Sequence, residues 1–399
     1  MPEPKPNRNV ALVDYRLTGH HPFYLATFAK SFQAIGCQVT LIVSDAATCR
    51  KEMQAALPGF NLESVRIHES ASKPQTNRRL GCRSYFLLQE LERELSKLES
   101  TTKQKFDFVF FAYLDDFCQE DPYLHYWLKP PFKRKFSGLL MAARERLKGA
   151  KRQGLASKLT TTFVQTKEAN FDSIGVLTED YQEQTARILG KQATVFPDFC
   201  STPIKSIESS NPLVSEVAEK KQNRKVVSLL GSIQPHKSVD LLLAAQEQTD
   251  PDDFLFVIAG KLQLKKHDPI TQDKIQQVLN DPPENVIFFN DWIPNEHVFD
   301  SIISHSDYLF AFYRNFKKSS NLVTKGAQYS VPSIVNEKYL MGERVRKYQL
   351  GLAVSEPDVV KLFTNGQLTN DWEFDTALQA EFNRQHDAQR LTEIFEGYF

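Results

Sequence analysis

The chain has 399 residues and carries 49 basic and 49 acidic side chains, so its formal net charge at neutral pH is zero. This balance argues against a globally basic nucleic-acid-binding protein, and we expect no nucleic-acid partner. The length allows roughly two or three domains of ordinary size. Hydrophobic residues make up 41% of the sequence and 29 residues are phenylalanine, which is enough for substantial cores.

The cysteines and the apolar runs indicate the compartment. The five cysteines are odd in number and lack C-x-x-C spacing, which favours reduced thiols in the cytosol over a disulfide framework or a zinc site. No run approaches the roughly 18 apolar residues of a membrane-spanning helix, and the first residues contain no apolar segment. We therefore expect a cytoplasmic protein that can still touch a membrane surface.

In the first half of the chain, strand patterns alternate with helix patterns. Near-continuous apolar runs at residues 9–15, 38–44 and 106–114 are typical of strands that are buried on both faces. Apolar residues along one side of residues 22–35 predict a helix between the first two strands. Residues 84–98 show the pattern of an amphipathic helix.

The second half shows the same alternation more regularly. Strands are predicted at residues 226–233, 254–261, 285–293 and 306–313, and residues 319–335 read as a polar loop, a helix and another strand. Strand, loop and helix recur at a spacing of roughly thirty residues, which favours βαβ units and a parallel sheet.

Ligands bind to such sheets at the carboxyl ends of the strands. The residues predicted at these ends are glycines, hydroxyl and amide side chains and lysines, which suit a diphosphate. They are Gly231, Ser232, Lys237, Lys261, Ser319, Ser320, Asn321 and Lys325.

Three segments carry a resemblance to a known family. They read GSIQPHKSVDLLLAA at residues 231–245, SSNLVTKGAQYSVPSIV at 319–335, and ERVRKYQLGLAV at 343–354. In this order they resemble the phosphate loop, the donor segment and the following helix of retaining glycosyltransferases with the GT-B fold, especially glycosyltransferase family four. The likeness covers most of the chain.

The resemblance implies an α/β protein with two Rossmann-like domains that face each other across a cleft. We expect an acceptor-side domain at residues 1–199, a linker at 200–224 and a donor-binding domain at 225–374. The C-terminal helical region, 375–399, is expected to pack back on the first domain. Asp198 is expected to be a hinge residue.

The implied reaction is transfer of a hexose from a nucleotide diphosphate sugar to a hydroxyl acceptor, with retention and without a metal or another cofactor. The acceptor would be a glycan, a lipid-linked sugar or a small molecule. Helix N-terminal N–H groups and cationic side chains would stabilise the departing diphosphate. We expect Lys237, Ser319, Ser320 and Lys325 to do so; in the alternative interpretation the serines only cap a helix and the lysines are solvated.

The chain departs from the family pattern at two places. Where the family has two glutamates across the donor loop and helix, alignment on Pro332 places Lys317 and Lys325. The arginine of the phosphate loop is Ser232, whereas its lysine is retained as Lys237. One hypothesis is that Lys325 reaches the diphosphate and offsets the missing arginine.

The resemblance implies acceptor chemistry in the first half, because in the family the loop after the first strand faces the cleft near the donor phosphate and the acceptor, and the end of the third strand often carries a cleft residue. His20 and His21 follow Gly19 after the first strand, and either can hydrogen-bond a phosphate or an acceptor hydroxyl. Asp115 and Asp116 follow the third strand and can orient or deprotonate that hydroxyl. The alternative for the carboxylates is a helix N-cap. Since no metal-ligand cluster accompanies the histidines, no metal site is expected.

Residues 129–158 are strongly basic, with apolar residues interleaved. A basic amphipathic helix of this kind can dock on anionic lipid, and the alternative is a solvated helix with its apolar side in the core.

Two other functions remain open. The loss of both glutamates and the arginine favours a catalytically silent GT-B-like scaffold that binds a nucleotide, a glycan or a protein. A GT-B-fold phosphorylase or epimerase is the third interpretation. The paired carboxylates of a glycoside hydrolase cannot be assigned from the spacing.

Overall fold

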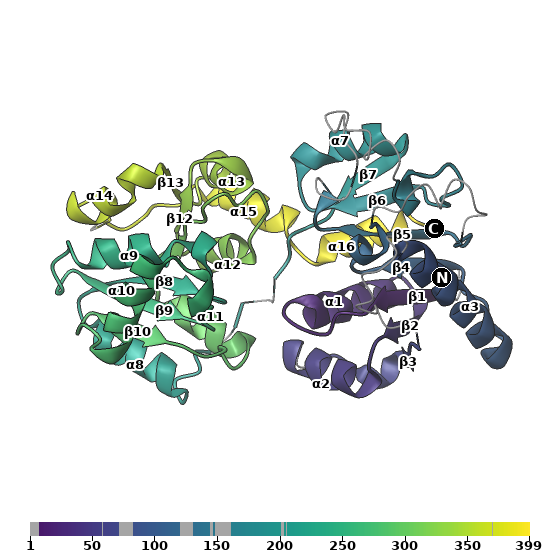
Figure 1. Ribbon diagram of the computed structural model, residues 1–399, viewed down its shortest axis with the longest axis horizontal. Helices are drawn as coiled ribbons and strands as arrows, with labels where there is room; N and C mark the ends of the chain where they lie inside the picture. Colours follow the sequence, from purple (N-terminus) through teal and green to yellow (C-terminus); the bar gives the residue numbers. More distant parts are fainter. Residues whose placement is uncertain are drawn as a thin grey trace. The chain divides into compact units, whose positions relative to one another are not determined.

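The computed structural model of the protein describes residues 8–57, 59–71, 83–119, 131–143, 147, 161–200, 203–204, 206–368 and 370–399. The chain forms two compact units (Figure 1). The first unit comprises Met1–Pro197 and Ala388–Phe399, and the second comprises Asp198–Asp387. The chain therefore passes between the units twice, after Pro197 and after Asp387.

The first unit contains a seven-stranded sheet with the order β3-β2-β1-β4-β5-β6-β7, in which all neighbouring strands are parallel. Its central strands are buried on both faces, which explains their continuous apolar sequences. The strands are β1 (Arg8–Asp14), β2 (Cys37–Val43), β3 (Arg66–Glu69), β4 (Phe108–Phe111), β5 (Phe136–Leu140), β6 (Ser173–Val176) and β7 (Gln192–Val195).

Helices cover both faces of this sheet. On one face α3 packs leucines against alternate residues of β1 and β4. On the other face α1 and α16 pack together, and the rings of Phe32 and Phe395 stack with their centroids 3.9 Å apart. The last residues of the chain thus complete the core of the first unit. The helices are α1 (His21–Ala34), α2 (Ala46–Ala56), α3 (Arg83–Thr102), α7 (Glu179–Leu189) and α16 (Gln389–Glu396).

The second unit contains a six-stranded sheet with the order β10-β9-β8-β11-β12-β13, again with parallel neighbours throughout. The strand order turns back at β8, so β9 and β11 flank the first strand of the unit. The strands are β8 (Lys225–Leu230), β9 (Phe254–Ala259), β10 (Val286–Phe289), β11 (Tyr308–Ala311), β12 (Ser333–Asn336) and β13 (Gly351–Val354).

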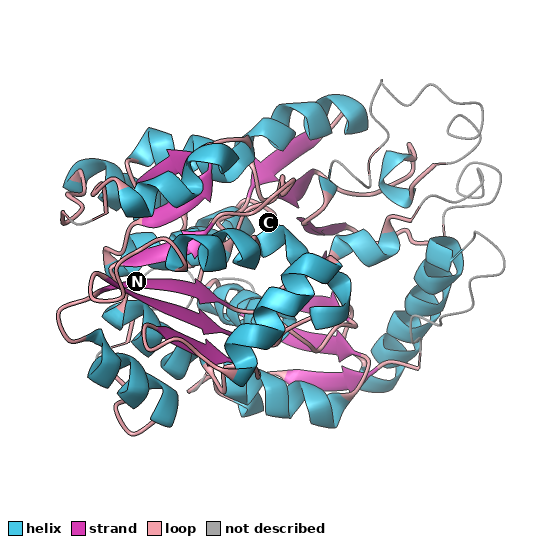
Figure 2. Cartoon of the chain, turned by 60° about the vertical axis from the view of Figure 1, so that its left-hand side comes forward, coloured by secondary structure: helices cyan, strands magenta, loops and turns pink. Residues whose placement is uncertain are grey.

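Two apolar layers sandwich this second sheet, as Figure 2 shows by the helices that lie over its strands. Val226 and Leu230 of β8 face α8, α11, α12, α13 and α15, whereas Val227 and Leu229 face α9, α10 and α14. The helices are α8 (Pro212–Lys221), α9 (Val239–Gln246), α10 (Pro269–Asn280), α11 (Glu296–His305), α12 (Asn321–Tyr329), α13 (Tyr339–Tyr348), α14 (Val359–Thr364) and α15 (Thr376–Gln385).

The predicted fold class is confirmed, since both units are parallel α/β sheets covered by helices. The strands predicted from continuous apolar runs are all present, with ends that shift by a few residues. The predicted strand at 106–114 is shorter, because after β4 the chain turns into a 3-10 helix, η2 (Leu114–Phe117).

Three expectations of the sequence need correction. The expected linker at 200–224 contains α8, whose residues Leu213, Val214 and Val217 pack in the core of the second unit. The expected C-terminal region, 375–399, is divided, because α15 belongs to the second unit and only the residues from Ala388 onward belong to the first.

The third correction concerns the basic segment 129–158, which was expected to form a helix. Its residues Phe136–Leu140 form strand β5, whose five residues are all buried. Phe136 and Leu140 pack with the core on the α3 side, so the apolar residues of this segment belong to a sheet. Most of its basic residues lie outside the described part of the chain, and so does the proposed lipid contact.

The described cysteines Cys37, Cys49, Cys118 and Cys200 are buried free thiols. Cys82 lies outside the described residues. Among the helices of the described ranges, none has the length and apolar character to cross a bilayer.

Candidate functional site

The phosphate loop, which we define as residues 231–238, follows the carboxyl end of β8. Gly231 has a φ of +87°, and a Cβ atom on it would lie 3.0 Å from the Nζ atom of Lys237. On the neighbouring strand end, a Cβ atom on Gly260 would lie 2.1 Å from the carbonyl oxygen of Gly231. Both glycines are therefore required for the turn and its close packing.

Lys237 is held over this turn. Its Nζ atom donates a hydrogen bond to the carbonyl oxygen of Leu230 at 2.5 Å and lies 5.5 Å from the centre of the Tyr313 ring. In the part of the chain that is described, no carboxylate pairs with Lys237. Its positive charge is thus available to an anion at the carboxyl end of β8.

The loop after β11 packs against the phosphate loop. The backbone N–H of Arg314 donates to the carbonyl oxygen of His236 at 2.7 Å. The Arg314 guanidinium bonds Asp240 at 2.7 Å and Glu356 at 2.8 Å. The ring of Phe316 stacks on that of His236 with centroids 5.3 Å apart and an interplanar angle of 7°. The loop that leads to the predicted donor segment is therefore held against the phosphate loop.

The serines before α12 have different partners. Ser320 is the N-cap, and its hydroxyl accepts a hydrogen bond from the N–H of Leu322 at 3.3 Å. The Ser319 hydroxyl donates to the Asp198 carboxylate and accepts a hydrogen bond from Arg344 at 2.6 Å. Asn321 is the first residue of α12. Ser319 is thus tied to the first residue of the second unit.

Lys325 lies in the core and not at the strand end where it was predicted to bind the donor. It is 5% exposed and pairs with Asp300, which is fully buried, and with Glu296 at 2.8 Å. Burial alone would lower the pKa of Lys325, but these two carboxylates reverse the direction and raise it. This ion pair argues against the hypothesis that Lys325 offsets the missing arginine. Lys261 is partly exposed, and its Nζ atom lies 3.5 Å from Asp291.

The first unit carries a second polar cluster at the carboxyl end of its sheet. Asp14 is the last residue of β1, and its Oδ2 atom lies 2.9 Å from Nδ1 of His21, the first residue of α1. Gly19 has a φ of +65° in the turn between them, and Pro22 fits the first turn of the helix. His20 is exposed and stacks on His21 with ring centroids 4.8 Å apart.

The aspartate in this pair is in an unfavourable place for a charge. Burial raises the pKa of Asp14, and the hydrogen bond and charge of His21 offset only part of that effect. Since an ionised carboxylate only accepts hydrogen bonds, its presence places the proton of a neutral His21 on Nδ1 and leaves Nε2 as an acceptor.

The two predicted carboxylates of η2 have mainly structural partners. Asp115 is fully buried and accepts hydrogen bonds from the N–H groups of Met141 and Ala142, at 2.8 and 3.0 Å. Asp116 binds Arg16 at 2.8 and 2.6 Å. The guanidinium carbon of Arg16 lies 4.4 Å from the centre of the Tyr113 ring. Asp115 thus fixes the end of β5.

Sequence reasoning missed several of these residues, namely Asp14, Arg16, Tyr113, His236 and Arg344. Asp14 offered a signal, because it is the first charged residue after the apolar run of β1 and stands at the strand's carboxyl end. Arg344 offered none, since its partner Ser319 is 25 residues away in the sequence.

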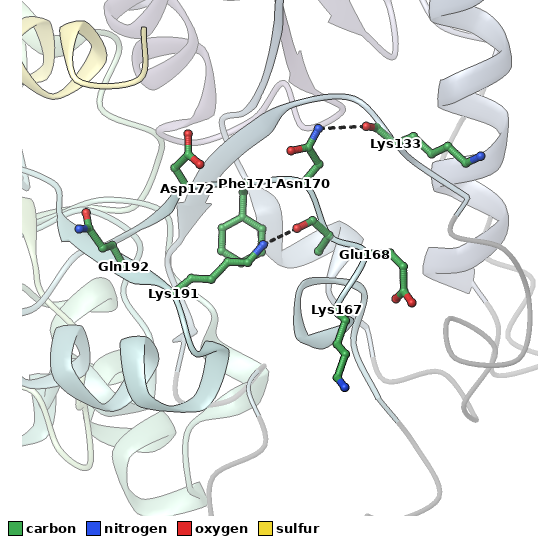
Figure 3. Close-up of a pocket in the computed structure, with 9 residues that line it drawn as sticks. Lys133, Lys167, Glu168, Asn170, Phe171, Asp172, Lys191 and Gln192 are labelled. Atoms are coloured by element: carbon green, nitrogen blue, oxygen red, sulfur yellow. Dashed lines mark hydrogen bonds between the residues drawn. The ribbon is translucent and has the colours of Figure 1, made fainter.

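A surface depression of about 880 Å³ lies elsewhere in the first unit (Figure 3). Its lining includes Lys133, the loop 167–172, and Lys191, whose Nζ atom bonds the carbonyl oxygen of Ala169 at 2.5 Å. It lies beside the amino ends of β6 and β7, away from the carboxyl-end clusters. Among the described residues, no group of three or more histidine, cysteine or carboxylate side chains could hold a metal ion.

Comparison with known proteins identifies the fold. No family model matches the chain, and no curated protein matches its sequence. The solved structure of HepE from Anabaena in complex with UDP and glucose is similar, with a TM-score of 0.63 at 12% identity over 98% of this chain and 99% of HepE.

Two further solved structures agree. Sucrose-phosphate synthase from Thermosynechococcus elongatus has a TM-score of 0.61 at 10% identity, over 98% of both chains. WaaG, a glycosyltransferase involved in lipopolysaccharide biosynthesis, has a TM-score of 0.59 at 13% identity, over 98% of this chain and 96% of WaaG. With its two parallel sheets of seven and six strands, the chain has the α/β fold of the GT-B glycosyltransferases.

Proposed function

We propose that the protein transfers a hexose from a nucleotide diphosphate sugar to a hydroxyl group of a glycan or a lipid-linked sugar, with retention and without a metal ion. The observation that carries the proposal is Lys237, an ammonium group over a glycine turn at the carboxyl end of β8. A diphosphate is the ligand that such a turn fits best, because backbone N–H groups and a cation act together on its oxygens.

The donor half of the reaction needs charge stabilisation more than proton transfer. As the bond between the anomeric carbon and the diphosphate breaks, negative charge grows on the leaving oxygen. Lys237 stabilises that charge directly, and the N-terminus of α12, capped by Ser320, adds the positive end of a helix dipole. The similar HepE structure contains UDP, which supports a nucleotide at this fold.

The acceptor half uses the Asp14–His21 pair. Asp14 fixes the tautomer of His21, so Nε2 accepts a hydrogen bond from an acceptor hydroxyl next to the one that attacks, and in this way positions the acceptor. In a retaining transfer the hydroxyl attacks on the face from which the diphosphate leaves, and a diphosphate oxygen takes the hydroxyl proton. The new glycosidic bond then replaces the bond to the diphosphate.

One observation favours a second function, a catalytically silent scaffold that binds a nucleotide, a glycan or a protein. The position of the family's second glutamate is Lys325, and its ammonium group is buried in an ion pair with Asp300. The chain therefore has no carboxylate at the position of the family's second glutamate.

A ligand screen separates these two functions. The thermal stability of the purified protein is measured with UDP, GDP, ADP and TDP, each with Mg²⁺, with Mn²⁺ and with EDTA. A diphosphate at one hundred times its Kd should add about 2.7 kcal/mol, with or without a metal. The matching nucleotide sugar should then give a product with the donor's anomeric configuration by NMR. Stabilisation without turnover would support the scaffold, and no stabilisation by any nucleotide would contradict the transferase.

A further inference from the structure

The donor site is short of positive charge. A nucleotide sugar carries about two negative charges on its diphosphate, and the second family cation is replaced by the neutral Ser232. Lys325 is buried with Asp300. Arg314, on the adjoining loop, is neutralised by Asp240 and Glu356. Lys237 alone leaves about half of the diphosphate charge without a partner at the phosphate loop.

His236 is the next residue in the loop that can carry a charge. Its ring lies flat on Phe316 and meets the Tyr313 ring edge-on, with centroids 5.5 Å apart. The same Tyr313 ring lies 5.5 Å from the Lys237 ammonium, so imidazole and ammonium flank one aromatic side chain. The hydrogen bond from Arg314 to the His236 carbonyl oxygen fixes the backbone.

The ring nitrogens of His236 have no hydrogen-bond partner among the residues that the structure describes, although the residue is half-buried. The stack on Phe316 and the edge contact with Tyr313 hold the plane of the ring while the nitrogens stay open to a ligand. A histidine that served only as packing would be equally well replaced by phenylalanine.

We propose that His236 is a second donor-binding residue, whose imidazolium bonds the diphosphate of the nucleotide sugar beside Lys237. The inference rests on the proposed function, because it assigns the missing cation of the same site. His236 becomes protonated when the diphosphate binds, so the protein takes up a proton together with the donor.

The charges around His236 set the direction of this coupling. Burial, followed by the positive charge of Lys237, lowers the pKa of His236 in the free protein. Arg314 on the adjoining loop is balanced by Asp240 and Glu356. A bound diphosphate raises the pKa again. Affinity therefore increases as the pH falls through the pKa of the complex, and levels off below the pKa of the free protein.

The test measures nucleotide-sugar affinity by calorimetry at about pH 5.5 and about pH 8, on either side of an ordinary histidine pKa. The probes are UDP-glucose, GDP-mannose, ADP-glucose and dTDP-glucose. Their diphosphates have no ionisation near pH 6, whereas the terminal phosphate of UDP does. Two variants are compared with the wild type: His236→Gln keeps a hydrogen-bonding group, and His236→Phe keeps the stack on Phe316.

We expect the wild type to bind its preferred probe about tenfold more tightly at the lower pH. Both variants should lose that pH response. At both pH values their affinity should equal that of the wild type at the higher pH. A pH response that persists in His236→Gln, or a His236→Phe variant as tight as the wild type at low pH, would overturn the inference alone. If no probe binds the wild type at either pH, the proposed function and the inference fail together.

Discussion

The carboxyl ends of the two sheets hold polar clusters of opposite character. In the first unit the acidic groups have side-chain partners: the Asp14 carboxylate is hydrogen-bonded to His21, and Asp116 pairs with Arg16. In the second unit, the partners of Lys237 among the described residues are a carbonyl oxygen and an aromatic face. In the proposed reaction the first edge would bind the acceptor hydroxyls and the second would hold the anionic donor. Two sheets of similar topology would then serve the two halves of one transfer.

The comparison also shows that a charged residue near a strand end need not face a ligand. Lys325 and Asp115 were both predicted to act at these edges, and both point into the protein. Lys325 joins α12 to α11 through Asp300, and Asp115 holds the backbone after β5. Both residues therefore have structural roles at the carboxyl ends of the sheets.

The largest effect expected from a single substitution is on folding. Lys325→Ala leaves the buried Asp300 without its ammonium partner, which should lower the free energy of unfolding by about 3–5 kcal/mol. Chemical denaturation measures the change. Lys317→Ala, which removes an exposed lysine eight positions earlier, should change stability by less than about 0.5 kcal/mol. If Lys325→Ala is as stable as the wild type but binds nucleotide more weakly, Lys325 contacts the donor and its structural role is contradicted.

The next effect is on turnover. His21→Asn removes the nitrogen that positions the acceptor and should lower kcat by about 10²-fold, with nucleotide affinity unchanged. Steady-state kinetics and calorimetry measure the two quantities. His20→Asn is the matched control, because His20 is exposed and has no carboxylate partner among the described residues; its kcat should fall by less than about tenfold. Equal losses in both variants would contradict the role of the Asp14–His21 pair.

A smaller effect, on nucleotide binding, distinguishes Lys237 from Lys261, the lysines that follow the carboxyl ends of β8 and β9. Lys237→Ala removes a charge-assisted contact and should weaken nucleotide binding by about 10- to 100-fold, with an unchanged melting temperature. Lys261→Ala should weaken binding by less than about threefold, because the partly exposed Lys261 already lies near the carboxylate of Asp291. The reverse order of effects would move the diphosphate from the end of β8 to the end of β9.

The sequence predicts the second unit better than the first, for a physical reason. The strands β8 and β9 are continuous apolar runs that end in glycine, so the predicted ranges 226–233 and 254–261 nearly match them. The segment that contains β5 has basic residues on both sides, and its five-residue strand was hidden in an apparent amphipathic helix. Short buried strands have no periodicity that separates them from a buried helix turn.

The candidate site divides in a similar way. Gly231 and Lys237 lie six residues apart within one loop, so their proximity follows from local sequence. Ser319, Asp198 and Arg344 come from three distant segments, and Lys325 meets Asp300 across two helices. Those contacts depend on packing that a sequence pattern does not contain.

The smallest effect concerns the cost of keeping Asp14 ionised. Because burial raises the pKa of Asp14 in the folded protein, its contribution to stability is present at low pH and is lost as the pH rises through that value. Asp14→Asn removes the buried charge, so the substitution should not lower the melting temperature at neutral pH. We expect this even though the amide has one oxygen to accept hydrogen bonds from two donors, His21 and Arg16. As the pH falls toward about 4, the melting temperature of the wild type should rise relative to that of Asp14→Asn. If the melting temperature of Asp14→Asn at neutral pH is more than about 8 °C below that of the wild type, Asp14 stabilises the fold as an anion. The Asp14–His21 pair would then be a structural ion pair and not part of an acceptor site.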